Sequence, residues 1–194
     1  IYIALHALES GIVTAEDSLL PWNGMRYPYD AWNREQTLES AMTNSVNWYF
    51  QALDQQIGLE SAHSFIREIG YGNQTAGSDI SSYWLDSSLK ISPVEQVELL
   101  RQLHEGALPV SPENAGAVQN VIRLSATERG TLYGKTGTES MDGKSTSGWF
   151  IGYIENESGT YYFATNIRQE DHATGTAATG LTFRILADLG IWAP

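Results

Sequence analysis

The sequence predicts an α+β fold in which an antiparallel sheet is flanked by helices, with a helical subdomain beside the sheet. Apolar residues recur at helical spacing through much of the first two thirds of the chain, aromatic and β-branched runs begin at Thr131, and helical spacing returns near the end. Helices, then a meander, then a closing helix is the order of a layered α+β domain. A chain of 194 residues suits one medium domain. We therefore expect a single domain, with a helical region over roughly 31–125 and a C-terminal sheet and helix over roughly 131–192.

The chain opens on an apolar run from Ile1 to Leu8, which is typical of a helix buried on nearly all sides. Gly11 is the usual signal for a helix end, whereas no helix start signal precedes Ile1. We expect this helix to begin upstream and the chain to lack the N-terminal part of its domain. The segment from Gly11 to Asp30 is rich in turn formers and aromatic residues and predicts an ordered loop.

Further helices are expected in the middle of the chain. Helical spacing over 39–57 ends at Gly58, and a second helix over 59–69 follows at once. Ser92-Pro93-Val94-Glu95 has the form of a capping box with proline at the first helical position. The apolar face expected for that helix consists of Val94, Val97, Leu99, Leu100 and Leu103. Ser111-Pro112 begins another, weaker helix.

The last third of the chain predicts the sheet. Three aromatic and β-branched runs, 131–136, 148–154 and 161–167, are separated by Gly, Asn, Asp and Ser. They predict three antiparallel strands in sequence order. Helical spacing over 177–189 then predicts the closing helix.

Composition excludes several classes of function. With 11 Lys and Arg against 23 Asp and Glu, the net charge is −12, and such a field repels phosphate backbones and anionic lipid. No nucleic acid is therefore expected as a ligand. The chain has no cysteine, which removes disulfides, zinc–cysteine sites and thiol nucleophiles. No metal-binding motif and no apolar stretch of the roughly 20 residues that span a bilayer occurs.

Ser45-Val46-Asn47 is the first of three short motifs with a chemical interpretation. It stands at or near the start of an amphipathic helix, where a serine is usually an N-cap. The functional alternative is that the Ser45 hydroxyl projects into a cleft as a proton relay, while the Asn47 amide turns toward a bound ligand. The second motif, Tyr71-Gly72-Asn73, reads otherwise as a glycine-rich turn.

Lys135-Thr136-Gly137-Thr138, at the end of the first predicted strand, is the third motif. A lysine and two threonines on an edge strand make a strip suited to an anion, and Gly137 lets another backbone approach closely. Such an edge can hold an extended acyl-amide ligand by added-strand hydrogen bonds, while Lys135 and the threonine hydroxyls attract its carboxylate. A solvated edge strand is the alternative. The chain contains no Gly-x-Ser-x-Gly nucleophile elbow.

In this order and at these separations, the three motifs resemble the later motifs of the serine penicillin-recognising proteins, and Tyr71-Gly72-Asn73 resembles the signature of their class D branch. Longer stretches are similar to the extracellular sensor domain of the BlaR/MecR β-lactam sensor-transducers. These are Tyr27 to Asn33, Asn44 to Gln51, Tyr83 to Asp86, Leu89 to Gln96 and Gly148 to Tyr153. The resemblance covers essentially the whole chain and implies a β-lactamase/transpeptidase-like fold.

The resemblance also implies a mechanism. A serine before Ile1 would open the β-lactam ring and form an acyl-enzyme, and a lysine one helical turn after it, carbamylated by carbon dioxide, would be the general base. Ser45 would relay protons to the lactam nitrogen and Lys135 would support it electrostatically. Thr136 and Thr138 would bind the ligand carboxylate, and the Thr138 backbone N–H would contribute to the oxyanion hole. Trp84 would pack beside the modified lysine and hold it in place.

Asn47 is the position that favours a sensor over a hydrolase. A carbamate persists in an apolar pocket without competing polar contacts, and class D β-lactamases typically place valine at this position. An asparagine amide can hydrogen-bond the free amine and so favour loss of the carbamate after acylation. Without that base the ester is not hydrolysed, and long-lived acylation is what a sensor needs. Arg168, at the end of the third strand, is a further candidate for the ligand carboxylate, although a solvated strand end explains it as well.

The leading hypothesis is therefore a sensor ectodomain that binds β-lactam antibiotics, lies outside the cytoplasm and is anchored through upstream membrane segments. A secreted or lipid-anchored class D β-lactamase is the alternative. A cell-wall transpeptidase or carboxypeptidase is a third, although Tyr71-Gly72-Asn73 does not fit it. An acidic carbohydrate-binding domain with aromatic loops is a fourth. Apart from the carbon dioxide of the carbamate, no cofactor is expected.

Overall fold

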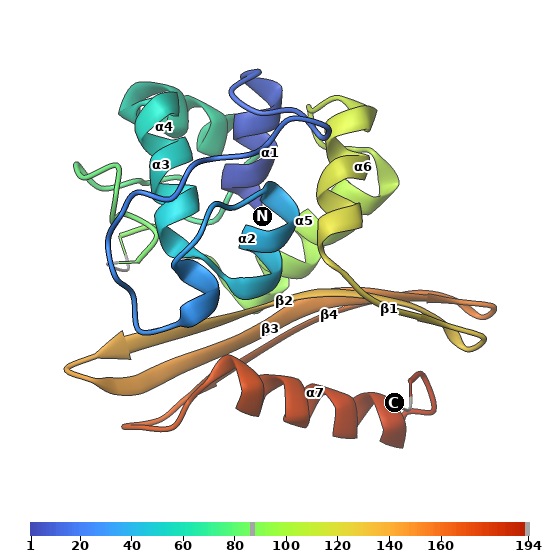
Figure 1. Cartoon of the computed structure of the whole chain (residues 1–194). Coiled ribbons are helices and arrows are strands. Elements are labelled where there is room, and N and C mark those ends of the chain that lie inside the picture. The colour runs from blue at the N-terminus through green and yellow to red at the C-terminus, as the bar shows by residue number, and fades with distance from the viewer. Residues whose placement is uncertain (86–87, 193–194) are drawn as a thin grey trace. The chain divides into compact units, whose positions relative to one another are not determined.

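The computed structural model describes residues 1–85 and 88–192 (Figure 1). The chain forms two compact units, each with its own core. Unit 1 consists of Ile1–Lys90 and Gly106–Ile122, and unit 2 of Ile91–Glu105 and Arg123–Pro194. Within the described ranges the elements are helices and a single four-stranded sheet, which confirms the predicted α+β class.

Unit 1 is helical. It contains α1 (Tyr2–Glu9), a short 3₁₀-helix η1 (Asp30–Trp32), α2 (Leu38–Asn44), α3 (Asn47–Ile57), α4 (Leu59–Glu68) and α6 (Pro112–Val121). The predicted apolar first helix is confirmed, because every residue from Tyr2 to Leu8 is buried. Ala4 and Ala7 are fully buried, and α1 packs against α3, α4 and α6. The helices predicted over 59–69 and from Ser111 are confirmed as well, and the Ser111 hydroxyl caps α6 by accepting from the backbone N–H of Asn114.

The single helix predicted over 39–57 is wrong, because the chain breaks it into α2 and α3. Ser45 ends α2 in the left-handed conformation, with φ of 51°, which is uncommon for a residue other than glycine, asparagine or aspartate. Val46 follows as the N-cap of α3. The expectation that Ser45 itself caps the second helix is therefore wrong. The apolar spacing continues across the break and so hides it.

Unit 2 is built on an antiparallel meander in the order β1-β2-β3-β4. Its strands are β1 (Arg123–Thr127), β2 (Gly130–Met141), β3 (Lys144–Asn156) and β4 (Gly159–Arg168). The three predicted strands are confirmed as β2 to β4. The sequence did not predict β1, because that strand is short and largely exposed and lacks the alternation of a half-buried strand.

Two helices pack on the sheet of unit 2. α7 (Gly175–Asp188) confirms the predicted closing helix and lies along one face (Figure 1). The core on that face consists of Leu132, Ile154, Leu186 and Trp192. α5 (Pro93–Glu105) packs against β3 and β4. His104 joins α5 to the sheet, with its ring nitrogens 2.6 Å from the Tyr162 hydroxyl and 2.9 Å from a Glu155 carboxylate oxygen.

The capping box at the start of α5 is confirmed. The backbone N–H of Ser92 donates to the Glu95 carboxylate at 2.8 Å, and that of Glu95 donates to the Ser92 hydroxyl at 3.3 Å. The expected apolar face is wrong at Val94, which is 79% exposed. Gln96, Leu99, Leu100 and Leu103 form the buried face instead. Val94 precedes Gln96 by two residues, about 200° around the helix, and so points away from the sheet.

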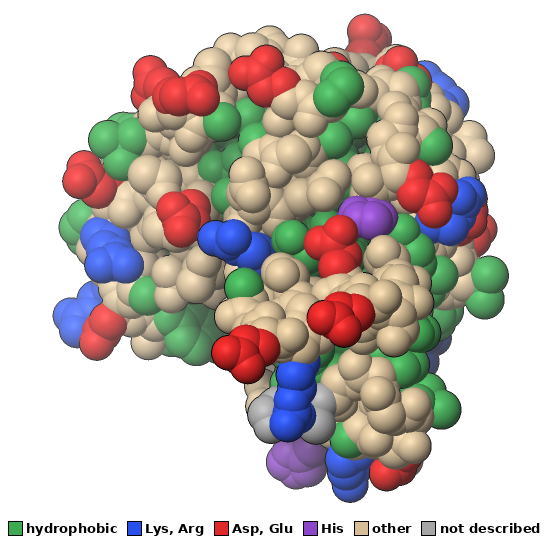
Figure 2. All heavy atoms as spheres, turned by 90° about the vertical axis from the view of Figure 1, so that its right-hand side faces the viewer, with side chains coloured by type: hydrophobic (Ala, Val, Ile, Leu, Met, Phe, Trp, Pro, Cys, Tyr) green, Lys and Arg blue, Asp and Glu red, His purple; other side chains and the backbone are tan. Residues whose placement is uncertain are grey.

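The surface agrees with the acidic composition. On the face drawn in Figure 2, the basic side chains lie apart from one another among acidic and neutral ones, and they form no continuous basic patch there. Among the described residues, no helix has the length and apolar character needed to cross a bilayer.

Candidate β-lactam site

The Ser45-Val46-Asn47 motif forms the junction between α2 and α3. Val46 is fully buried, while Ser45 and Asn47 on either side of it are half-buried. Two indole N–H groups fix the junction, since Trp32 donates to the backbone oxygen of Asn44 and Trp48 donates to that of Trp32, each at 2.9 Å. The left-handed turn at Ser45 therefore holds two polar side chains at a rigid, partly open corner of unit 1.

Trp84 makes a contact that the sequence did not predict. Its indole N–H donates to Oδ2 of Asp54 at 3.0 Å, and the Tyr83 hydroxyl donates to Oδ1 of the same carboxylate at 3.3 Å. Asp54 lies on α3 and is only 1% exposed. Burial raises the pKa of Asp54 to about 7, although the bonds from Tyr83 and Trp84 act in the opposite direction. The signal that could have identified Asp54 as a buried residue is its place among the apolar positions of α3, next to Leu53.

Tyr71-Gly72-Asn73 is joined by hydrogen bonds to a later segment of unit 1. Asn73 exchanges backbone and side-chain hydrogen bonds with Lys90 and donates its amide to the Ser88 backbone oxygen at 2.9 Å. Gly72 has φ of 52°, which favours glycine. The Tyr71 ring lies 4.7 Å from that of Tyr2, and burial raises the pKa of Tyr71 well above its usual range. The motif therefore has a structural role, which is the glycine-rich-turn interpretation.

Lys135 lies on β2 where that strand becomes an edge of the sheet. The pairing of β1 with β2 runs from Thr127–Gly130 to Arg123–Tyr133, whereas β3 pairs with β2 along its length. Beyond Tyr133, no described strand pairs with the other side of β2. The Lys135 ammonium donates to the Thr136 backbone oxygen at 2.9 Å. Burial lowers the pKa of Lys135 to about 8.

Thr136 and Thr138 face α7. The Thr138 hydroxyl accepts from the backbone N–H of Gly175 at 2.9 Å, and a Cβ on Gly175 would lie 2.9 Å from that of Thr136. Because side chains alternate along a strand, Lys135 points to the opposite face. The side chains expected to bind an anion thus lie on two faces of the sheet, with Thr136 and Thr138 toward α7 and Lys135 on the opposite face. The backbone of the β2 edge from Lys135 onward borders both faces. Binding of a carboxylate by the two threonines stays a prediction.

A family model for the penicillin binding protein transpeptidase domain matches residues 1–187. The chain belongs to this penicillin-binding family. Its three motifs occur within the matched range, which confirms the resemblance inferred from them.

The relatives of this penicillin-binding domain divide into sensors and hydrolases. It is 43% identical to the regulatory protein BlaR1 of Bacillus licheniformis over 99% of the chain and 32% of that protein. It is also 43% identical to the solved C-terminal domain of the B. licheniformis BlaR penicillin-receptor, with a TM-score of 0.94, covering 98% of this chain and 77% of that one. A class D β-lactamase from Bacillus subtilis is 36% identical, with a TM-score of 0.91, covering 99% and 78%. The chain spans about a third of the length of the curated BlaR1 relative.

The predicted site residues of this penicillin-binding domain fall into two groups. Ser45, Asn47 and Trp84 belong to unit 1, and Lys135 to Thr138 belong to unit 2. Arg168 is exposed at the end of β4, where its guanidinium donates to the Asn166 side chain at 3.1 Å, as the strand-end interpretation expects.

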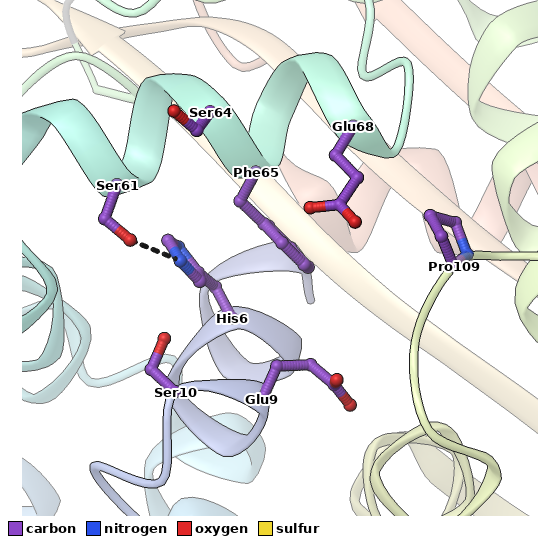
Figure 3. Close-up of a pocket in the computed structure, with 8 residues that line it drawn as sticks. All are labelled: His6, Glu9, Ser10, Ser61, Ser64, Phe65, Glu68 and Pro109. Atoms are coloured by element: carbon purple, nitrogen blue, oxygen red, sulfur yellow. Dashed lines mark hydrogen bonds between the residues drawn. The ribbon is translucent and has the colours of Figure 1, made fainter.

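One surface pocket of the penicillin-binding domain lies apart from these residues. Figure 3 shows His6 and Glu9 of α1 facing Ser61, Ser64, Phe65 and Glu68 of α4 around a cavity of about 200 Å³. The His6 ring stacks on Phe65 at 4.4 Å, and its Nε2 lies 3.0 Å from the Ser61 hydroxyl. Burial lowers the pKa of His6. None of the predicted site residues lines this pocket, and its histidine serves to pack α1 on α4.

Proposed function

We propose that this chain is the ligand-binding part of a β-lactam sensor, which penicillins acylate on a serine and which remains acylated. The observation that carries the proposal is the similarity to the BlaR penicillin-receptor domain along nearly the whole chain. That relative is a penicillin-receptor, which supports penicillin as the ligand class. On this proposal the domain lies outside the cytoplasm and is held at the membrane by upstream segments of its protein. The acylated serine lies between those segments and Ile1.

The residues take the roles that the family motif implies. Ser45 relays a proton toward the lactam nitrogen, and its fixed left-handed turn keeps the hydroxyl in one place. Lys135 supports this step, and its lowered pKa of about 8 means that its proton is held less tightly than that of a solvated lysine. The backbone of Thr136, Gly137 and Thr138, on the free edge of β2, binds the acyl amide as an added strand.

The described residues near the start of α1 fit a carbamylated lysine. The Tyr2 hydroxyl is buried and finds no partner with hydrogen-bond geometry among the described residues, although it lies beside that of Tyr83. A carbamate supplies acceptor oxygens and, when present, a general base. Tyr2 and Trp84 would hold it, and Asn47 would compete for the free amine. A buried hydroxyl without a well-formed hydrogen bond costs free energy, and an acceptor oxygen of such a group would lower that cost.

A class D β-lactamase is the second candidate. The similarity to the B. subtilis class D enzyme favours it, since that structure is nearly as close in fold. The half-buried Asn47 argues for the sensor, because its amide offers the lysine a partner that a valine would not. The difference between the two functions is then the rate of deacylation.

Turnover of a chromogenic cephalosporin by the full-length protein tests the proposal. We expect one stoichiometric burst of product followed by no further hydrolysis, because the acyl-serine persists. Sustained hydrolysis would instead assign the chain to the β-lactamases. Absence of any burst, with no covalent adduct in the mass spectrum, would reject both functions.

A further inference from the structure

Asp54 is a buried carboxylate that the mechanism above does not use. It lies on α3 seven residues after Asn47, and seven residues are nearly two full helical turns, so both lie on the same face of α3. Its two oxygens accept from Trp84 and Tyr83 at 3.0 and 3.3 Å. Within the described parts of the chain, no lysine or arginine forms an ion pair with it. A carboxylate in this setting is costly to keep ionised.

The surroundings of Asp54 lead back to the start of α1. The Tyr2 ring lies 6.4 Å from that of Tyr83, whose hydroxyl donates to Asp54, and 4.7 Å from that of Tyr71. Tyr2, Tyr83 and Asp54, which are buried, and Trp84, which is half-buried, therefore form one polar cluster in unit 1. On the proposed function, the modified lysine immediately precedes Ile1 and lies next to this cluster.

Asp54 and a lysine carbamate would both accept a hydrogen bond from the Trp84 indole. An indole has a single N–H, which donates and cannot accept. While Trp84 donates to Asp54, it is not available to a second anion. Asp54 and a carbamate would also be two negative charges in a poorly solvated pocket, and each disfavours the other.

We propose that Asp54 is a positioning residue that holds the Trp84 indole N–H and thereby weakens carbamylation of the neighbouring lysine. This inference rests on the proposed sensor function and deepens it. Loss of the carbamate keeps the acyl-serine from being hydrolysed. Asp54 thus acts in the same direction as Asn47, by withdrawing a partner that the carbamate needs.

Carbamylation can be measured without activity. The full-length protein, Asp54→Asn and Asp54→Ala are incubated with limiting ¹³C-bicarbonate, and the carbamate is measured by ¹³C NMR. We expect Asp54→Ala, which removes both the charge and the acceptor of the indole N–H, to raise the ratio of carbamylated to free lysine by on the order of tenfold, equivalent to about 1.4 kcal/mol. Asp54→Asn removes the charge but keeps an oxygen for the indole and should raise the ratio less. Asp79→Asn is the matched control, since Asp79 is an exposed carboxylate that bonds Ser81 and Ser82 instead of Trp84. It should leave the ratio unchanged.

A second readout tests whether Asp54 acts through Trp84. With 5-fluorotryptophan in every tryptophan position, Trp84→Phe assigns the ¹⁹F signal of residue 84. That signal should move in Asp54→Ala, which removes the acceptor, and stay in Asp79→Asn. Adding Trp84→Phe to Asp54→Ala should abolish the gain in carbamylation, because the donor released by the first change is then absent.

The outcomes separate the inference from the function on which it rests. If penicillin acylates every variant and the carbamate ratio does not depend on Asp54, or no carbamate forms, the inference is overturned while the sensor stands. If no variant is acylated, the proposed function fails. A gain in Asp54→Ala that persists in the double variant would also overturn the positioning role of Asp54.

Discussion

The buried carboxylate of Asp54 makes the stability of unit 1 depend on pH in an unusual direction. Asp→Asn at this position keeps the shape of the side chain and an oxygen for the Trp84 N–H, but removes the charge. The pKa is about 7 in the folded protein against an ordinary value of 3.8. Each pKa unit corresponds to 1.36 kcal/mol, so a shift of about three units is worth about 4 kcal/mol at full ionisation.

The sign follows from proton binding. Between pH 3.8 and about 7 the folded state holds the Asp54 proton while the unfolded state has released it. Stability therefore falls as pH rises through this range and levels off above it. Burial causes this rise in the pKa, and the hydrogen bonds from Tyr83 and Trp84 oppose it.

Urea unfolding, followed by tryptophan fluorescence at intervals from pH 4 to pH 8, measures the effect. Relative to the unsubstituted protein, Asp54→Asn should gain stability as pH rises, by about 4 kcal/mol at pH 8 compared with pH 4. Asp79→Asn is the control. The hydroxyl and backbone of Ser81 lower the pKa of Asp79, so Asp79 is ionised in both the folded and the unfolded state above about pH 5, and the stability difference for Asp79→Asn should stay nearly constant from there to pH 8. A stability difference for Asp54→Asn that does not vary with pH would refute the assigned burial and charge of this carboxylate.

Three further predictions concern the site and its support. Asn47→Val should increase retention of the carbamate and speed deacylation of the penicilloyl protein. A deacylation rate that is unchanged by the substitution and does not depend on carbon dioxide would contradict the role of Asn47. Lys135→Ala should slow acylation at least tenfold, about 1.4 kcal/mol, with little change in unfolding midpoint; an unaltered acylation rate would reject its place in the site. Gly175→Ala brings a methyl group to 2.9 Å from the Gly137 backbone oxygen and should destabilise unit 2 by about 1–3 kcal/mol. Gly180, on the same helix, has open space around it, so Gly180→Ala should stabilise α7 by about 0.5–1 kcal/mol. Equal effects of the two substitutions on stability would contradict the packing of α7 on β2.

Elements with strong local signals were predictable from the sequence. The apolar run of α1, the Ser92–Glu95 capping box and the aromatic strands β2 to β4 each carry their own periodicity or cap, and the structure confirms them. The break at Ser45 had no such signal, because neither glycine nor proline marks it and the apolar spacing runs through it. The exposed strand β1 likewise lacks alternation.

The residues of the candidate site were predictable only where they belong to a recognisable sequence motif. Ser45, Asn47 and Lys135 were identified by pattern, whereas the Asp54–Trp84 contact joins residues 30 positions apart and depends on tertiary packing. A single aspartate in a helix looks like a solvated residue until its burial is known. The division of Lys135 and the threonines between two faces follows from strand alternation, whereas the contact of Thr138 with α7 depends on tertiary packing and has no signal in the sequence.

The lifetime of the covalent adduct tests the sensor function most directly. After the full-length protein is mixed with one equivalent of benzylpenicillin, intact-mass spectrometry should show one penicilloyl group per chain, and the adduct should persist after free penicillin is removed. Peptide mapping should place it on a serine before Ile1. Rapid return to the unmodified mass, with penicilloic acid accumulating over repeated additions, would contradict the sensor and identify a β-lactamase.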